Sequence, residues 1–112
     1  MAISTAAAKA KGRNLQKKVR DAVLAKYPEL TEDDVRSCPM GSQGEDIQLS
    51  SAAKAAFPYS VECKARAKIA LVYDALEQAR SQNDLTPVAV IKADRKDALV
   101  VLTLEDFMRL IK

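Results

Sequence analysis

The chain has 112 residues, a length that suits one domain, and its 48% hydrophobic and 29% charged residues are typical of a globular protein. It contains no histidine, which excludes Ser-His and Cys-His triads and the usual zinc sites, and no apolar run approaches the roughly 20 residues of a membrane span. Any metal would therefore need oxygen ligands, which suit Mg²⁺, Ca²⁺ or Mn²⁺. The two cysteines are 25 residues apart and form no disulfide framework, so we expect a reducing, cytoplasmic compartment and no membrane partner.

Positive charge is concentrated at the start of the chain. Residues 1–26 carry seven Lys or Arg and one acid, a net charge of +6, whereas the rest of the chain carries a net charge of −3. This asymmetry indicates a polyanionic partner, with nucleic acid the first candidate; the alternative is a solvated helix face. We expect residues 1–13 to form a basic arm rather than a targeting segment. The candidate DNA contacts are Lys9, Lys11, Arg13, Lys17 and Lys18.

Hydrophobic periodicity predicts the elements of the first half. Leu15, Val19 and Val23 follow the helical period, and Pro28 ends that helix near Tyr27. A strand is expected around Val35, then a loop at 41–44, then a strand over 45–50 in which apolar and polar side chains alternate. Residues 51–57 are expected to form a short helical turn or loop, and residues 59–64 alternate again and predict a third strand.

The second half begins with a helix predicted over 67–81, whose buried stripe includes Ile69, Val72 and Leu76. The apolar run at 88–92 predicts a strand buried on both faces, followed by a charged turn and a strand over 99–102. Thr103 is expected to cap a last helix that extends to Ile111, with Asp106 as the acid of a capping box.

Two carboxylates and a lysine stand near the ends of the second and third predicted strands. If these strands are antiparallel neighbours, Asp46 and Glu62 meet at one site, and Lys64 points to the same face as Glu62. Two oxygen ligands and a cation are the minimum for Mg²⁺-assisted phosphodiester cleavage, and the backbone carbonyl of Cys63 is a possible third ligand. The alternative is an exposed ion pair on a strand.

The motifs "GED" and "FPYSVECK", together with "KGRNLQKKVRDAV", "ALEQA" and "PVAVIKADRKDALVVLTLEDF", resemble the PD-(D/E)XK nuclease superfamily, in particular small phage endonucleases related to Holliday junction resolvases. The resemblance implies one nuclease domain over 1–112. Its fold would be α/β, with an αβββαβ core, a mixed central sheet flanked by helices, and an extra C-terminal strand and helix. It also implies a Mg²⁺-dependent endodeoxyribonuclease, with Mn²⁺ as a substitute, that acts on branched or four-way DNA. A phage protein of this kind would work in the host cytoplasm.

The resemblance assigns catalysis to Asp46, Glu62 and Lys64. It also suggests that Gln78 faces the site from the central helix, with an exposed glutamine as the alternative. Many relatives carry a glutamate on the first helix as a further metal ligand, and this chain has Gln16 in that region. Lys92, at the end of the fourth predicted strand, either reaches the site or simply meets solvent.

Two functions remain open at this point. The neutral Gln16 favours a catalytically inactive relative that binds nucleic acid or acts as a scaffold, whereas the intact trio of Asp46, Glu62 and Lys64 favours the enzyme. Because resolving a junction takes two matched cuts, we expect a symmetric homodimer, formed through the first helix or the helix at 104–111.

Overall fold

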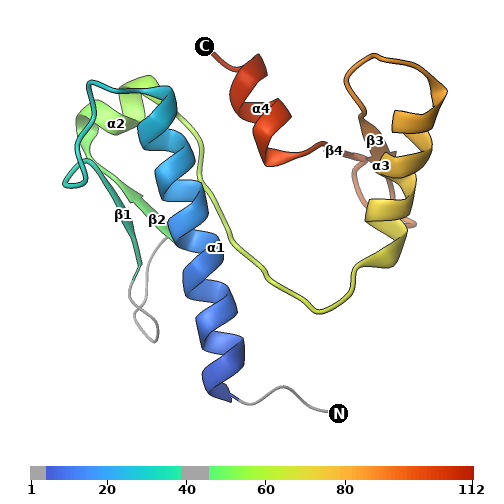
Figure 1. Ribbon diagram of the computed structural model, residues 1–112, viewed down its shortest axis with the longest axis horizontal. Helices are drawn as coiled ribbons and strands as arrows, with labels where there is room; N and C mark the ends of the chain where they lie inside the picture. The colour runs from blue at the N-terminus through green and yellow to red at the C-terminus, as the bar shows by residue number, and fades with distance from the viewer. Residues whose placement is uncertain (1–4, 39–45) are drawn as a thin grey trace. The chain divides into compact units, whose positions relative to one another are not determined.

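A computed structural model describes residues 5–38 and 46–112, which form two compact units, one ending at Ala65 and the other spanning Arg66–Lys112. Unit 1 contains α1 (Thr5–Lys26), β1 (Val35–Ser37), β2 (Ile47–Leu49) and α2 (Ser51–Ala56), and unit 2 contains α3 (Ala70–Gln82), β3 (Ala89–Ile91), β4 (Leu99–Val101) and α4 (Leu104–Leu110) (Figure 1). The predicted loop at 41–44 and the first four residues of the predicted basic arm lie outside the described residues; residues 5–13 of that arm belong to α1.

Unit 1 is built on helix α1, along which the hairpin strands β1 and β2 lie (Figure 1). The helix buries the stripe formed by Val19 and Val23, as its periodicity predicted. The strands pair antiparallel with Val35 opposite Leu49 and Ser37 opposite Ile47. The core of this unit consists of Val19, Val23, Tyr27, Leu30, Val35, Cys38, Ile47, Ala53 and Phe57.

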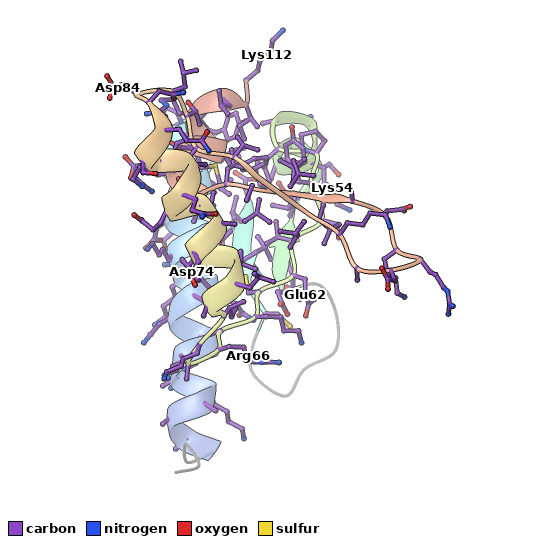
Figure 2. All side chains as sticks on the ribbon, turned by 90° about the vertical axis from the view of Figure 1, so that its right-hand side faces the viewer. Lys54, Glu62, Arg66, Asp74, Asp84 and Lys112 are labelled. Carbon is purple, nitrogen blue, oxygen red and sulfur yellow. The ribbon has the colours of Figure 1, made fainter. Side chains whose placement is uncertain are left out.

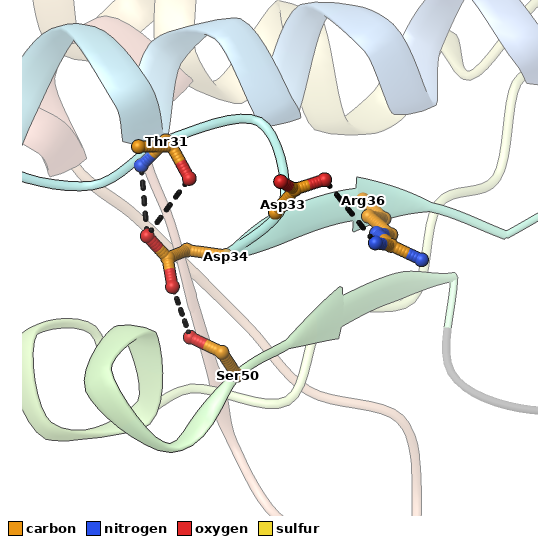
Figure 3. A network of polar contacts seen from close by, with 5 residues as sticks. All are labelled: Thr31, Asp33, Asp34, Arg36 and Ser50. Atoms are coloured by element: carbon orange, nitrogen blue, oxygen red, sulfur yellow. Dashed lines mark hydrogen bonds and ion pairs between the residues drawn. The ribbon is translucent and has the colours of Figure 1, made fainter.

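A polar staple closes the end of the hairpin where β1 begins and β2 ends (Figure 3). One carboxylate oxygen of Asp34 accepts hydrogen bonds from the backbone N–H and the hydroxyl of Thr31, and the other accepts one from the hydroxyl of Ser50. Ser50 also caps α2 by accepting from the backbone N–H of Ala53. The N–H of Thr31, then the hydroxyl of Ser50, lower the pKa of Asp34. The staple holds the register that positions the opposite, Asp46 end of β2.

Unit 2 joins helix α3 to the hairpin of β3 and β4. The helix contacts β3, and Val90 pairs directly with Val100. Leu76, Ala89 and Met108 are its buried apolar residues. Thr103 caps α4 as predicted, by accepting from the backbone N–H of Asp106, but the Asp106 carboxylate pairs with Arg109.

The predicted single central sheet is not observed. The protein is a mixed α/β structure in which the described residues form four helices and two separate two-stranded antiparallel sheets. The strand partner of β2 is β1, so the predicted pairing of the Asp46 and Glu62 strands is wrong. Buried strands need cover on both faces, and in this structure Val90 and Val100 are exposed. The prediction of a doubly buried strand at 88–92 is therefore also wrong.

The predicted strand over 59–64 is instead an extended segment without a sheet partner in the described chain. Its side chains still alternate, since Val61 and Cys63 are half-buried while Glu62 and Lys64 are exposed. Two features account for the missing ladder. Pro58 lacks an N–H, and the N–H of Cys63 is taken by a side chain rather than by a neighbouring strand.

Candidate functional site

Asp46 is held from two sides at the start of β2. Its backbone carbonyl accepts a hydrogen bond of 2.8 Å from the N–H of Cys38, which extends the β1–β2 ladder by one step. Its carboxylate oxygen Oδ2 accepts a hydrogen bond of 2.6 Å from the N–H of Cys63. This second bond joins residues 17 apart in sequence and fixes the extended segment against the end of the hairpin.

The hydrogen bond places Asp46 beside Cys63 of the Glu-Cys-Lys motif, although the strand pairing predicted to bring them together is not observed in the described residues. Glu62 and Lys64 flank Cys63 and project to the same side of the extended segment, where their side chains form an ion pair with an N–O distance of 3.3 Å. Both side chains are about two-thirds exposed, at 64% and 65%. Such an exposed pair contributes at most about 1 kcal/mol to stability, so the two groups remain available to a ligand.

Two negatively charged side chains, Asp46 and Glu62, lie near Cys63. Burial raises the pKa of the Cys63 thiol, and the negative charges of Asp46 and Glu62 raise it further. The same two carboxylates that disfavour a thiolate favour a cation. Cys63 is therefore not an activated nucleophile, in agreement with the absence of histidine.

The donor set suits a magnesium ion better than a metal that needs a full protein cage. No group of three or more His, Cys, Asp or Glu side chains that could hold a metal occurs among residues 5–38 and 46–112. Mg²⁺ is usually bound through one or two carboxylates, while waters and substrate phosphates complete the octahedron. Asp46 and Glu62 are the two carboxylates near Cys63, and Asp46 Oδ1 accepts no hydrogen bond from the described residues, so one oxygen of Asp46 could bind a cation.

Gln16 is a buried polar side chain in a stripe that is otherwise apolar. It is only 5% exposed and lies on the face of α1 that also carries Val19 and Val23. Within the described part of the chain, its oxygen Oε1 has no hydrogen-bond donor. An unsatisfied buried amide oxygen costs about 1–3 kcal/mol, so this position is not explained by core packing alone.

The predicted DNA contacts are exposed along α1. Lys9, Arg13 and Lys17 recur every fourth residue and share one face of the helix, whereas Lys11 and Lys18 lie on another. In the described structure none of these five has an acidic partner, in contrast to Arg20, which pairs with Asp21 at 3.0 Å. Like charges four residues apart destabilise a helix by a few tenths of a kcal/mol, so this row opposes stability.

The other accessory candidates belong to unit 2. Gln78 is exposed on α3, and the Lys92 ammonium donates to the backbone carbonyl of Ala93 at 3.3 Å. Their roles at the site stay predictions. The contact of Asp46 with the Cys63 N–H is not predictable from periodicity, because a side chain that replaces a ladder acceptor leaves no periodic signal.

Comparison with protein-family models, curated proteins and solved structures finds no match to this chain. Among the helices that the structure describes, none has the length and apolar character needed to cross a membrane.

Proposed function

We propose that the protein is a Mg²⁺-dependent endonuclease that hydrolyses DNA, with branched or four-way DNA as its substrate. The observation that carries this proposal is the hydrogen bond from the Cys63 N–H to the Asp46 carboxylate. It supports the proposal because it brings the isolated aspartate to the Glu62–Lys64 pair, which is the arrangement that the PD-(D/E)XK resemblance requires.

In this proposal the acidic residues bind the cation and the lysine binds the phosphate. Asp46, Glu62 and the Cys63 carbonyl would hold the cation, and Mg²⁺ bound there would supply Lewis-acid polarisation of the phosphate and a more acidic water. The Lys64 ammonium would donate to phosphate oxygens as negative charge develops on them. The Glu62–Lys64 contact of 3.3 Å is exposed, so both groups can exchange it for contacts to the cation and the phosphate at little cost.

Substrate binding is assigned to α1. The row of Lys9, Arg13 and Lys17 favours a polyanion, because its mutual repulsion is relieved only when negative charge lies against it. A homodimer with both rows on the DNA remains a prediction. The inactive nucleic-acid-binding relative is the second candidate, and the neutral Gln16 favours it.

The test is metal-dependent cleavage by a charge-removing variant. Glu62→Gln keeps the side-chain shape and loses only an exposed ion pair, so we expect a folded protein whose cleavage of plasmid and four-way junctions falls by orders of magnitude while DNA binding survives. Glu29→Gln, an exposed carboxylate elsewhere in unit 1, is the matched control and should cleave normally. Cleavage by the wild type should stop in EDTA. If Glu62→Gln cuts at the wild-type rate, the assigned site is wrong.

A further inference from the structure

Unit 1 exposes one aromatic side chain that belongs neither to its buried core nor to the proposed metal site. Of its described residues, Tyr59 is the one large hydrophobic side chain left exposed, at 41%. All other exposed large hydrophobic side chains of the described chain belong to unit 2. The exception lies three residues before Glu62, on the segment that carries the candidate active site.

The Tyr59 ring is held in place. The Tyr59 N–H donates to the Phe57 carbonyl at 2.9 Å, so Phe57–Tyr59 forms a γ-turn whose central residue, Pro58, favours the required backbone angle. The Tyr59 ring also packs edge-on against Phe57, with centroids 4.9 Å apart. Phe57 is fully buried and contacts Tyr27 at the end of α1, so the tyrosine rests on the core of the unit.

A pocket of about 280 Å³ adjoins this ring. It is lined by Leu49, Lys54, Pro58, Tyr59 and Ser60, which combine apolar walls, a hydroxyl and one cation. Lys54 is exposed in the last turn of α2, and Figure 2 labels it together with Glu62. The volume lies just below the roughly 300–1,000 Å³ of pockets for drug-sized ligands, so it suits one small planar group.

We propose that this pocket binds an unpaired nucleobase of the DNA strand near the cut, with the base stacked on Tyr59 and an adjacent phosphate contacted by Lys54. A fixed, half-exposed aromatic ring beside a lysine is the recurrent way in which proteins bind single-stranded nucleic acid. Bases inside a duplex are stacked on one another and cannot reach such a ring. The pocket would therefore select DNA with a single-stranded or opened position, such as branched substrates that carry a fork or a flap.

The position of the pocket sets where that base lies. Three residues from Tyr59 to Glu62 span at most about 10 Å, which corresponds to no more than roughly three nucleotides at the 3.4 Å rise of a stacked strand. Only the location of this base near the cut rests on the proposed function. The base-binding pocket itself does not require cleavage.

The experiment measures binding without catalysis. In the Glu62→Gln background and in EDTA, a labelled oligothymidylate and a single strand carrying 2-aminopurine are titrated with Tyr59→Ala, Tyr59→Phe and Tyr59→Leu proteins. We expect Tyr59→Ala and Tyr59→Leu to weaken single-strand binding about 5- to 150-fold and to abolish 2-aminopurine quenching. Tyr59→Phe should bind as the parent does, and the affinity for a blunt duplex should not change.

Two controls separate stacking from general effects. Tyr73→Ala removes a tyrosine of unit 2 that is 66% exposed and should leave single-strand binding unchanged. Tyr59→Leu retains apolar bulk against Phe57, so it reports on stacking even if Tyr59→Ala fails to fold. Lys54→Ala should lower the salt slope of single-strand binding by about one contact.

The outcomes distinguish the two proposals. One outcome is that the wild-type protein cleaves with Mg²⁺ while the Tyr59→Leu variant binds single strands as the parent does. This outcome overturns the base-binding proposal and leaves the nuclease proposal intact. A second outcome is that single-strand binding depends on Tyr59 but the protein never cleaves. This outcome supports the base-binding proposal and overturns the nuclease proposal. An equal loss of duplex and single-strand affinity in Tyr59→Leu also overturns the pocket, because stacking is specific to unpaired bases.

Discussion

Replacing Asp46 with asparagine and with alanine separates the structural role of this residue from its chemical role. The alanine variant leaves the half-buried N–H of Cys63 without its acceptor. Hydrogen bonds to charged acceptors contribute about 1.5–3 kcal/mol, and neutral ones about 0.5–1.5 kcal/mol. We therefore expect Asp46→Ala to lower the free energy of unfolding by about 2 kcal/mol and Asp46→Asn by about 1 kcal/mol, because the amide oxygen can still accept the bond.

Urea denaturation followed by circular dichroism measures both values, and amide hydrogen exchange measures the bond directly. The Cys63 N–H should exchange slowly in the wild type and in Asp46→Asn, and fast in Asp46→Ala. Asp94→Ala, an exposed carboxylate in the β3–β4 turn, is the control and should change stability by less than about 0.5 kcal/mol. Both Asp46 variants should abolish cleavage, since neither supplies a charged oxygen ligand.

The same variants alter the Cys63 thiol. Since the Asp46 charge contributes to the raised pKa of Cys63, its removal should lower that pKa and speed alkylation by iodoacetamide at pH 8, as followed by peptide mass mapping. Burial continues to raise the pKa in Asp46→Asn, so its rate should stay below that of an unfolded thiol. Equal destabilisation by asparagine and alanine, with no change in Cys63 exchange or alkylation, would refute the assigned hydrogen bond.

Two further predictions concern the staple and the basic helix. Because the pKa of Asp34 is lowered in the folded protein, the Asp34 carboxylate stabilises the fold above the ordinary pKa of 3.8, and this stabilisation is lost as pH falls through the folded pKa. The urea midpoints of the wild type and Asp34→Asn should therefore differ at pH 7 and converge towards pH 2. A difference that stays constant with pH would contradict the assigned role of Asp34. Replacing Lys9, Arg13 and Lys17 with glutamine should weaken binding to all DNA sequences alike and reduce the log–log salt slope by two to three contacts; an unchanged slope would show that this face of α1 does not touch DNA.

The sequence by itself determined the elements whose causes are local. The helical period of Val19 and Val23 placed α1, and the side chain of Thr103 placed the start of α4. Alternation correctly predicted that Glu62 and Lys64 are more exposed than Val61 and Cys63, because this depends only on local backbone geometry. It also placed Tyr59 on the face of Val61 and Cys63, and there it was wrong, since Tyr59 is exposed. The three proposed catalytic residues were also selected from sequence, because their spacing and residue types are chemical facts that do not depend on packing.

Only the tertiary structure decided how these pieces are joined. Alternation shows that a segment is extended but not what accepts its N–H groups, and here a carboxylate of β2 accepts the Cys63 N–H. The pairing of β2 with β1 likewise depends on loop closure and on the contact with α1, which no local pattern encodes. The γ-turn at Phe57–Tyr59 is local, but the pocket beside it also needs Leu49 and Lys54, which packing brings from β2 and α2.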